Sequence, residues 1–134
     1  MGGYIICYGV ALAMLTIGDA LWLSWFGQAV VRPALGATMR DQLVWTPVAL
    51  FYVLYAAGVV VFAIEPALRG KSLFTAAALG LLFGFMAYMT YDLTNMATLK
   101  AWTVKLVVMD VAWGTFITGL SAVASTAVCR ALGR

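Results

Sequence analysis

The sequence has 134 residues, of which 65% are hydrophobic and 10% charged; eight Lys and Arg against five Asp and Glu give a net charge of +3, and histidine is absent. Soluble domains are about 45–50% apolar and about 25% charged, and a chain this short cannot bury so much apolar surface in water. The composition therefore excludes a disordered chain, a coiled coil, a nucleic-acid-binding domain and a soluble enzyme, and it predicts a protein that lies partly in lipid.

Four long apolar stretches predict four membrane-spanning helices, at about 4–26, 46–64, 72–96 and 103–128. Each stretch is close to the ~20 residues that a helix needs to cross the hydrocarbon layer. None shows the alternation of a barrel strand, and no Lys or Arg precedes the first stretch, which favours a span over a cleaved signal peptide. We therefore expect an all-α fold, an antiparallel four-helix bundle that forms a single transmembrane domain over residues 1–134.

The connections between the spans differ in length. Residues 65–71 and 97–102 form short turns, so the second and third spans, and the third and fourth, should be neighbours. The connection at 27–45 is longer and mixes apolar residues with Arg32 and Arg40. This mixture predicts an interfacial segment in the headgroup layer, with a plain loop as the alternative.

The prolines agree with these boundaries. Thr46 followed by Pro47 is typical of a helix N-cap and first helical position. Glu65 followed by Pro66 predicts the end of the second span, because proline disfavours helical geometry in the residue before it. Pro33 lies in the first connection, so we expect no proline to interrupt a span.

Lysines and arginines are divided equally between the two sides of the predicted bundle. The side of the termini has Arg69, Lys71, Arg130 and Arg134, and the other side has Arg32, Arg40, Lys100 and Lys105. The positive-inside rule is therefore tied. We favour an orientation with the termini inside, because Arg69 and Lys71 share one compact loop and Arg130 and Arg134 directly follow the last span.

Three of the five acidic residues lie within or at the ends of spans, where a carboxylate costs at least ~2.5–3.5 kcal/mol at mid-bilayer. Asp19 comes late in the first span, Asp92 late in the third, and Asp110 early in the fourth. Because alternate spans run in opposite directions, all three should lie in the leaflet away from the termini. The cations expected on the same side, as a lid or as headgroup contacts, are Arg32, Arg40, Lys100 and Lys105.

Small and polar residues repeat at steps of three or four in two spans. The third span has Ala76, Gly80, Gly84, Tyr88 and Asp92, and the fourth has Asp110, Gly114, Thr118, Ser121 and Ser125. Residues four apart share a helix face, and small residues allow helices to approach closely. These stripes predict a helix contact, within the chain or between subunits, that opens into an acidic site.

A tryptophan follows an aspartate after three residues in two spans, as Asp19–Trp22 and Asp110–Trp113. The indole groups would donate to the acids or wall a pocket; for Trp22, and for Trp25, Trp45 and Trp102, an interfacial belt is the alternative. The candidate ligand- or proton-binding residues are Asp19, Trp22, Tyr88, Tyr91, Asp92, Asn95, Asp110 and Trp113. A purely structural network of hydrogen bonds is the competing interpretation, but its ~0.6 kcal/mol per contact is small against three insertion penalties.

Histidine and cysteine usage restricts the chemistry further. Without histidine there is no His-ligated haem or metal, no Ser-His-Asp triad and no histidine proton relay, so we predict no cofactor and no metal, and no catalytic residue is identified. Cys7 and Cys129 are too few for a disulfide scaffold or a thiolate-only metal site. Two small apolar fillers are the simplest interpretation.

The chain also resembles the bacterial membrane family catalogued as domain-of-unknown-function family 2177. The matching blocks are Asp19-Ala20-Leu21-Trp22, Phe51-Tyr52-Val53-Leu54-Tyr55, Val61-Phe62-Ala63 with Pro66-Ala67-Leu68, Tyr91-Asp92-Leu93-Thr94-Asn95-Met96-Ala97-Thr98-Leu99 and Asp110-Val111-Ala112-Trp113-Gly114-Thr115. The resemblance implies a small four-span protein of the bacterial inner membrane. It implies no activity, but its blocks contain most of the candidate site residues.

Three functions are compatible with these observations. The first is a pocket that binds, or acts on, a lipid or apolar small molecule, with the acids as its polar end. The second is proton- or cation-coupled transport of a small molecule, which is an analogy to small exporters. The third is an accessory or assembly subunit of a larger membrane complex. Expected partners are membrane lipids, an apolar small molecule, and a second copy or a larger complex, with no nucleic acid.

Overall fold

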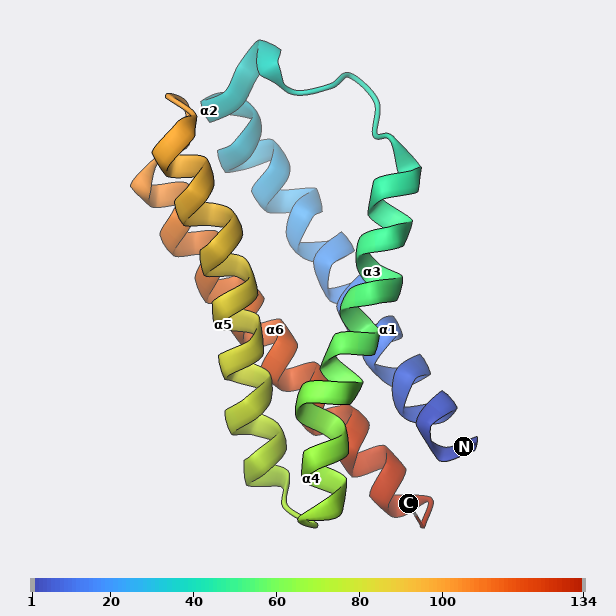
Figure 1. Ribbon diagram of the computed structural model, residues 1–134. Helices are drawn as coiled ribbons and strands as arrows, with labels where there is room; N and C mark the ends of the chain where they lie inside the picture. Colours follow the sequence, from blue (N-terminus) through green and yellow to red (C-terminus); the bar gives the residue numbers. More distant parts are fainter. Residues whose placement is uncertain (1, 134) are drawn as a thin grey trace.

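The computed structural model describes residues 2–133 as four long helical rods that run antiparallel to one another (Figure 1). Helices long and apolar enough to cross a membrane cover Gly3–Thr38, Trp45–Arg69, Leu73–Thr98 and Val104–Ala131, and no strand occurs in the described chain. The all-α fold with four spans is therefore confirmed. The two termini and the turn before Leu73 lie at one end of the bundle, which we call the terminal end (Figure 1). The segment after Thr38 and the turn at 99–103 lie at the opposite end, which we call the far end.

The first rod extends well beyond its predicted end. Helix α1 covers Gly2–Phe26 and continues through a π-helical turn at Gly27–Val31 into α2 at Arg32–Leu35. A short 3-10 turn at Gly36–Thr38 follows, so the irregular chain is confined to 39–44. Much of the predicted interfacial segment is thus a continuation of the first helix, and its contact with lipid headgroups stays a prediction.

The second rod corrects two of the predicted boundaries. Helix α3 covers Trp45–Val59, with Val44 before it and no side-chain cap, so Thr46 is not the N-cap. A π-helical turn at Val60–Ile64 then leads into α4 at Glu65–Arg69, so Pro66 does not end the span. The predicted cap was wrong because the first four N–H groups of a helix lack helical partners anyway, so a proline is tolerated slightly inside the helix as well as at its first position.

Pro33 and Pro66 occupy equivalent places in the two rods. Each is the second residue of an α-helical segment that directly follows a five-residue π-helical turn. A proline inside a helix removes one backbone donor and its ring collides with the carbonyl group four residues earlier, whereas the wider π turn changes the hydrogen-bond register at that point. The rods therefore continue past both prolines.

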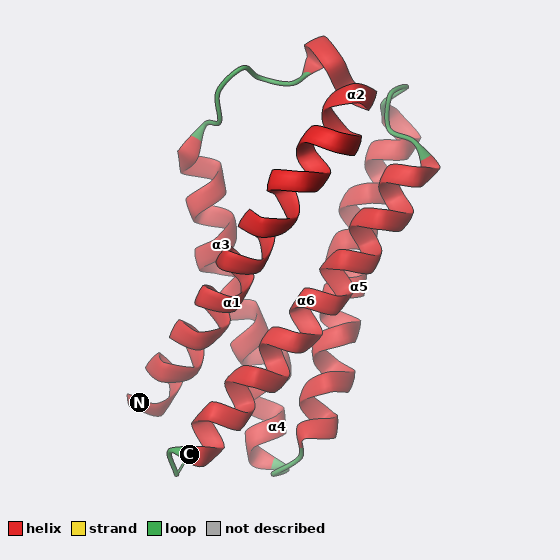
Figure 2. Ribbon diagram, turned by 180° about the vertical axis from the view of Figure 1, so that it is seen from behind, coloured by secondary structure: helices red, strands yellow, loops and turns green. Residues whose placement is uncertain are grey.

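Helices α5 (Leu73–Thr98) and α6 (Val104–Ala131) lie side by side from the far end into the middle of the bundle and diverge toward the terminal end (Figure 2). The Ser72 and Thr103 hydroxyl groups cap them by accepting the backbone N–H of Thr75 and Leu106. As the short turns predict, α5 also contacts the second rod.

The small-residue stripe of α5 packs on α6 within the chain. A Cβ atom added to Gly80 would lie 2.7 Å from the Cβ of Ala122, and one added to Gly84 would lie 2.7 Å from the carbonyl oxygen of Gly114. Both distances are too short for a real side chain, so the two helix backbones touch here only because these positions are glycine.

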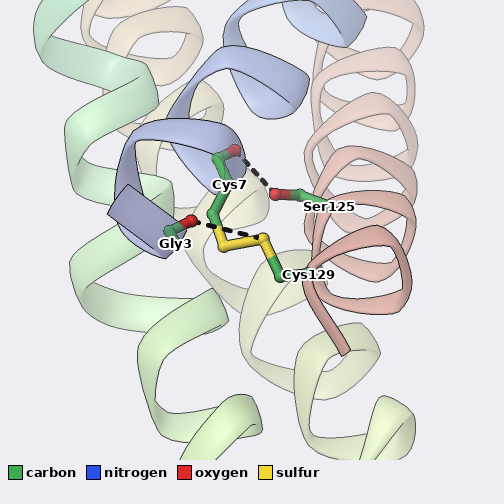
Figure 3. Close-up of a disulfide and its surroundings, with 4 residues drawn as sticks. All are labelled: Gly3, Cys7, Ser125 and Cys129. Carbon is green, nitrogen blue, oxygen red and sulfur yellow. Dashed lines mark hydrogen bonds between the residues drawn. A yellow bond between two sulfur atoms is a disulfide. The ribbon is translucent and has the colours of Figure 1, made fainter. Parts of the chain in front are cut away.

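Cys7 and Cys129 form a disulfide that joins α1 to α6 near the terminal end (Figure 3). Both side chains are fully buried, and their Cα atoms are 5.9 Å apart. The hydroxyl group of Ser125 donates to the carbonyl oxygen of Cys7 at 2.7 Å, and the sulfur of Cys129 lies 3.6 Å from the carbonyl oxygen of Gly3 (Figure 3). The interpretation of the two cysteines as small apolar fillers was wrong. One lies early in the first span and the other at the end of the fourth, and because these spans are antiparallel, both cysteines lie near the terminal end.

Large apolar side chains cover the outside of the bundle. Among the most exposed are Ile5, Leu21, Leu54, Phe74 and Val104, which come from all four rods. Such a surface is unfavourable in water and suited to lipid chains. The protein is therefore a multi-pass membrane protein whose outer face contacts lipid.

Candidate functional site

A cavity of about 390 Å³ lies at the far end of the bundle, between α1, α3, α5 and α6. Its lining consists of two acids, three aliphatic residues and eight aromatic residues: Asp19, Trp22, Leu23, Phe26, Val31, Phe51, Tyr52, Ala87, Tyr88, Tyr91, Trp102, Asp110 and Trp113. The wall is thus mostly apolar and aromatic, with the polar groups concentrated at few points. This combination is typical of a small-molecule site.

Asp19 reaches the cavity because it continues the buried face of α1. Cys7, Ala11 and Leu15 are fully buried at steps of four, and Asp19, at the next step, is only 5% exposed. A carboxylate on such a face must find donors or a wet cavity. The same periodicity that places Leu15 in the core therefore places Asp19 at the bottom of the cavity.

Three side chains from three other helices donate hydrogen bonds to Asp19. The Tyr52 hydroxyl group of α3 lies 2.6 Å from Oδ2, and the Tyr88 hydroxyl group of α5 lies 3.4 Å from the same atom. The Trp113 Nε1 of α6 donates to Oδ1 at 2.7 Å. Asp19 thus connects all four rods at the level of the cavity, and its two oxygens are satisfied by the protein itself.

Gly114 allows Tyr88 to take this position. A Cβ atom at Gly114 would lie 2.1 Å from the Cγ of the Tyr88 ring, so the ring rests directly on the α6 backbone. The glycine stripe between α5 and α6 therefore continues into the site, where it makes room for an aromatic ring.

Asp92 and Asp110 form a second acidic group beside the first. Asp92 is fully buried; its Oδ1 accepts the Trp102 Nε1 at 3.2 Å, and its Oδ2 receives no N–H or O–H donor from the described residues. The carboxyl groups of Asp92 and Asp110 lie close to each other. Of the two, Asp110 lines the cavity.

Stacked rings form one wall of the cavity. The Trp22 ring lies 4.9 Å from that of Trp113 with an angle of 5° between them, and 4.7 Å from that of Phe26 with an angle of 20°. Tyr91 meets Trp102 edge to face at 5.6 Å. The Trp22 Nε1 is buried and has no acceptor among the described residues, so one indole donor beside the cavity is unused.

Six of the predicted site residues line this cavity, and two do not. Those that line it are Asp19, Trp22, Tyr88, Tyr91, Asp110 and Trp113. Asp92, which lies close to Asp110, and Asn95 are both outside the lining. The spans thus bring the three acids to one end of the bundle, while the binding role of these residues stays a prediction.

The predicted basic lid does not cover the cavity. The side chains of Arg32, Arg40, Lys100 and Lys105 are all exposed, and none of them lines it. Arg32 lies on the helical continuation α2, Arg40 lies in the irregular chain at 39–44, and Lys100 and Lys105 lie in the turn before α6 and in its first turn. Their contact with lipid headgroups stays a prediction.

Sequence reasoning missed Phe51, Tyr52 and Trp102 as parts of the site. Phe51 and Tyr52 come early in the second span, which begins at the far end, so the depth argument used for the acids would have found them. Trp102 was weighed as an interfacial belt residue, but it is 9% exposed and bonded to Asp92. Trp25 and Trp45, at 53% and 69% exposed, keep the positions that a belt requires.

A four-span membrane bundle with an acidic, aromatic-lined cavity at one end is the class of protein that this fold and site define. Residues 4–127 match the family of predicted membrane proteins DUF2177, and the chain belongs to this family. No curated protein and no solved structure matches the chain.

Proposed function

We propose that the protein binds a lipid or an apolar small molecule in the cavity at the far end. The polar group of the ligand contacts Asp110, and its apolar part packs against the aromatic wall. The observation that carries this proposal is the cavity itself, which combines a carboxyl group with a mostly aromatic lining. Its volume of about 390 Å³ lies within the range of ~300–1,000 Å³ that is typical of ligand pockets.

The two acids of the lining favour different roles. Asp19 accepts hydrogen bonds from three protein donors, which is the pattern of a residue that organises the site. Asp110 receives no N–H or O–H hydrogen bond from the described chain apart from its contact with Asp92. A group that lines a cavity without protein donors is available to a ligand, so Asp110 is the ligand contact that we propose.

Native mass spectrometry of the purified protein tests the proposal. We expect a retained lipid or small molecule, and we expect Ala87→Leu, which fills part of the cavity, to reduce its retention at least tenfold. Ala78→Leu is the matched control, because Ala78 is an exposed position of the same helix. A protein without any bound molecule in several lipids, or equal retention by both variants, would contradict the proposal.

Coupled transport is a second candidate, favoured by the Asp92–Asp110 pair beside the cavity. Two neighbouring carboxyl groups beside a ligand site are one arrangement that lets a ligand and a proton exchange. The test is proton flux into proteoliposomes with Asp92→Asn and Asp110→Asn, with Asp41→Asn as the exposed control. Unchanged flux in the first two variants removes this candidate.

We also propose that the protein resides in the bacterial inner membrane with its terminal end at the oxidising face. The count of Lys and Arg is tied and only weakly favours termini inside, whereas disulfides form and persist in oxidising compartments. The Cys7–Cys129 bond at the terminal end supports the outside placement. Reporter enzymes fused to the C-terminus distinguish the two orientations.

Partners other than lipid are also tested by purification in mild detergent. A second copy at fixed stoichiometry would indicate a homodimer. A different protein at fixed stoichiometry would favour the accessory-subunit hypothesis over a ligand-binding one.

A further inference from the structure

We infer that the ligand of the cavity is a hydrophobic organic cation, such as a quaternary ammonium compound or a protonated amine. This inference rests on the proposed function and adds the charge of the ligand to it. Three independent features of the cavity lead to it: acidic groups without a basic partner, an aromatic lining and the size of the space.

The acidic groups have no cation of their own. Within residues 2–133 the structure has one ion pair, between Arg69 and Glu65 at the terminal end. The basic residues of the far end are exposed and do not line the cavity. Asp19 and Asp110 therefore face a mostly apolar space with no basic side chain to balance a negative charge on either carboxyl group. Charges interact strongly in such surroundings, so an anion is repelled, and a neutral ligand leaves the charge unpaired.

The aromatic lining is suited to a cation that carries apolar groups. Aromatic rings attract cations to their faces, and cages of such rings are a common way to bind quaternary ammonium groups. The Trp22 and Trp113 rings stack on each other, and Tyr91 and Trp102 stand edge to face beside Asp110. Tyr52, Tyr88 and Tyr91 also line the cavity beside these rings, so the wall offers aromatic and apolar contact to one ligand.

The size of the cavity and its donor set argue against a bare metal ion. About 390 Å³ is far more than one ion needs. No three Asp, Glu or Cys side chains in the described part of the chain are arranged to hold a metal. A bulky monovalent cation satisfies the charge and fills the space.

The test compares tetraphenylphosphonium with tetraphenylborate, two ions of nearly the same size and shape and of opposite charge, and with neutral triphenylphosphine oxide. Binding to the full chain in nanodiscs of zwitterionic lipid is measured by tryptophan quenching and calorimetry, after subtraction of empty nanodiscs. We expect saturable binding of the cation at one site per chain, and at least tenfold weaker binding of the other two compounds.

Two variants place the binding in the cavity. Asp110→Asn should weaken binding of the cation at least tenfold, whereas Asp41→Asn, the same change at an exposed acid of the same end, should leave it unchanged. If Asp110→Asn does not fold, Tyr91→Leu serves instead: Tyr91 is 54% exposed, so its loss spares the core, and losing its ring face should weaken cation binding about threefold.

The outcomes separate the two proposals. Equal or tighter binding of the anion or the neutral compound, or unchanged cation binding by Asp110→Asn, overturns the inference while leaving a ligand site in place. Absence of binding by all three compounds, together with no retained molecule in native mass spectrometry, overturns the proposed function as well.

Discussion

The two ends of the bundle are built from the same helices but on opposite principles. From the middle of the bundle toward the terminal end, small residues allow α5 and α6 to touch and a disulfide joins α1 to α6. At the far end, large aromatic residues hold the helices apart around a cavity with acidic groups. We call the first part the closed half, because helix backbones touch there, and the second part the open half, because its side chains surround a cavity.

The change from one principle to the other happens along a single face of α5. Ala76, Gly80 and Gly84 are buried, the two glycines against α6, and the next steps of four bring Tyr88 and then Asp92 to the same face. Side-chain size therefore increases along this face exactly where the cavity begins. Gly114 is the point of transition, because α6 still lacks a side chain there while α5 already carries a ring.

The most severe test of this comparison is Gly84→Leu, which forces the closed half apart. A new Cβ atom would lie 2.6 Å from that of Thr118 and 2.7 Å from the backbone oxygen of Gly114, and a backbone atom cannot move out of the way. Overpacking of this kind costs ~1–3 kcal/mol, and we expect the upper end of that range. The measurement is the unfolding temperature in mild detergent, which should fall by many degrees.

Gly9→Ala is the control for this change. A Cβ atom at Gly9 of α1 would have no neighbour within 4 Å. Replacing a helical glycine with alanine in open space stabilises a helix by ~0.5–1 kcal/mol, so this variant should melt at the same or a slightly higher temperature. Equal destabilisation by both changes would contradict the close contact between α5 and α6.

Removing the disulfide with Cys7→Ala and Cys129→Ala should loosen the terminal end. Disulfides typically contribute ~2–4 kcal/mol by restricting the unfolded chain, and we expect about 2 kcal/mol because membrane helices stay formed when the bundle opens. The drop in unfolding temperature should match the drop that a reductant causes in the native chain. The double variant itself should not respond to the reductant; a response there would show that the effect lies elsewhere.

The sequence predicts the closed half better than the open one. Spacing and residue size suffice for the stripe from Ala76 to Gly84, because a face without side chains has few alternatives to close packing. The depth of Asp19, Asp92 and Asp110 also follows from span direction alone. Both inferences need only the order of residues along a helix.

The sequence does not determine how the four rods are rotated and placed relative to one another. That Tyr52, Tyr88 and Trp113 all reach Asp19 depends on how three helices rotate about their axes, which no single span determines. The continuation of the rods past Pro33 and Pro66 depends on π-helical turns that have no simple sequence signature. The Cys7–Cys129 disulfide could have been predicted from the direction of the spans. It was not predicted because two cysteines are too few to indicate a disulfide scaffold.

Asp19→Asn tests whether the open half has a structural anchor of its own. An asparagine side chain has one acceptor oxygen in place of two, so either the Trp113 indole or the two tyrosine hydroxyl groups lose their partner. A buried donor left without an acceptor costs ~1–3 kcal/mol. We expect a loss of about 1–2 kcal/mol in detergent unfolding, and Tyr52→Phe, which removes one of these donors, should lose less. No loss in Asp19→Asn would contradict the anchoring role.

Asp110→Asn should have the smallest effect on stability, within about 0.5 kcal/mol of the native chain. The new amide group can donate to Asp92 Oδ2, which has no N–H or O–H donor in the described chain. Groups kept for binding often contribute little to folding or oppose it, so removing them tends to leave stability unchanged or to raise it. The unfolding temperature of Asp110→Asn beside that of Asp19→Asn measures this difference directly. A loss as large as that of Asp19→Asn would assign both acids to the scaffold and remove the distinction between an anchoring acid and a ligand-facing one.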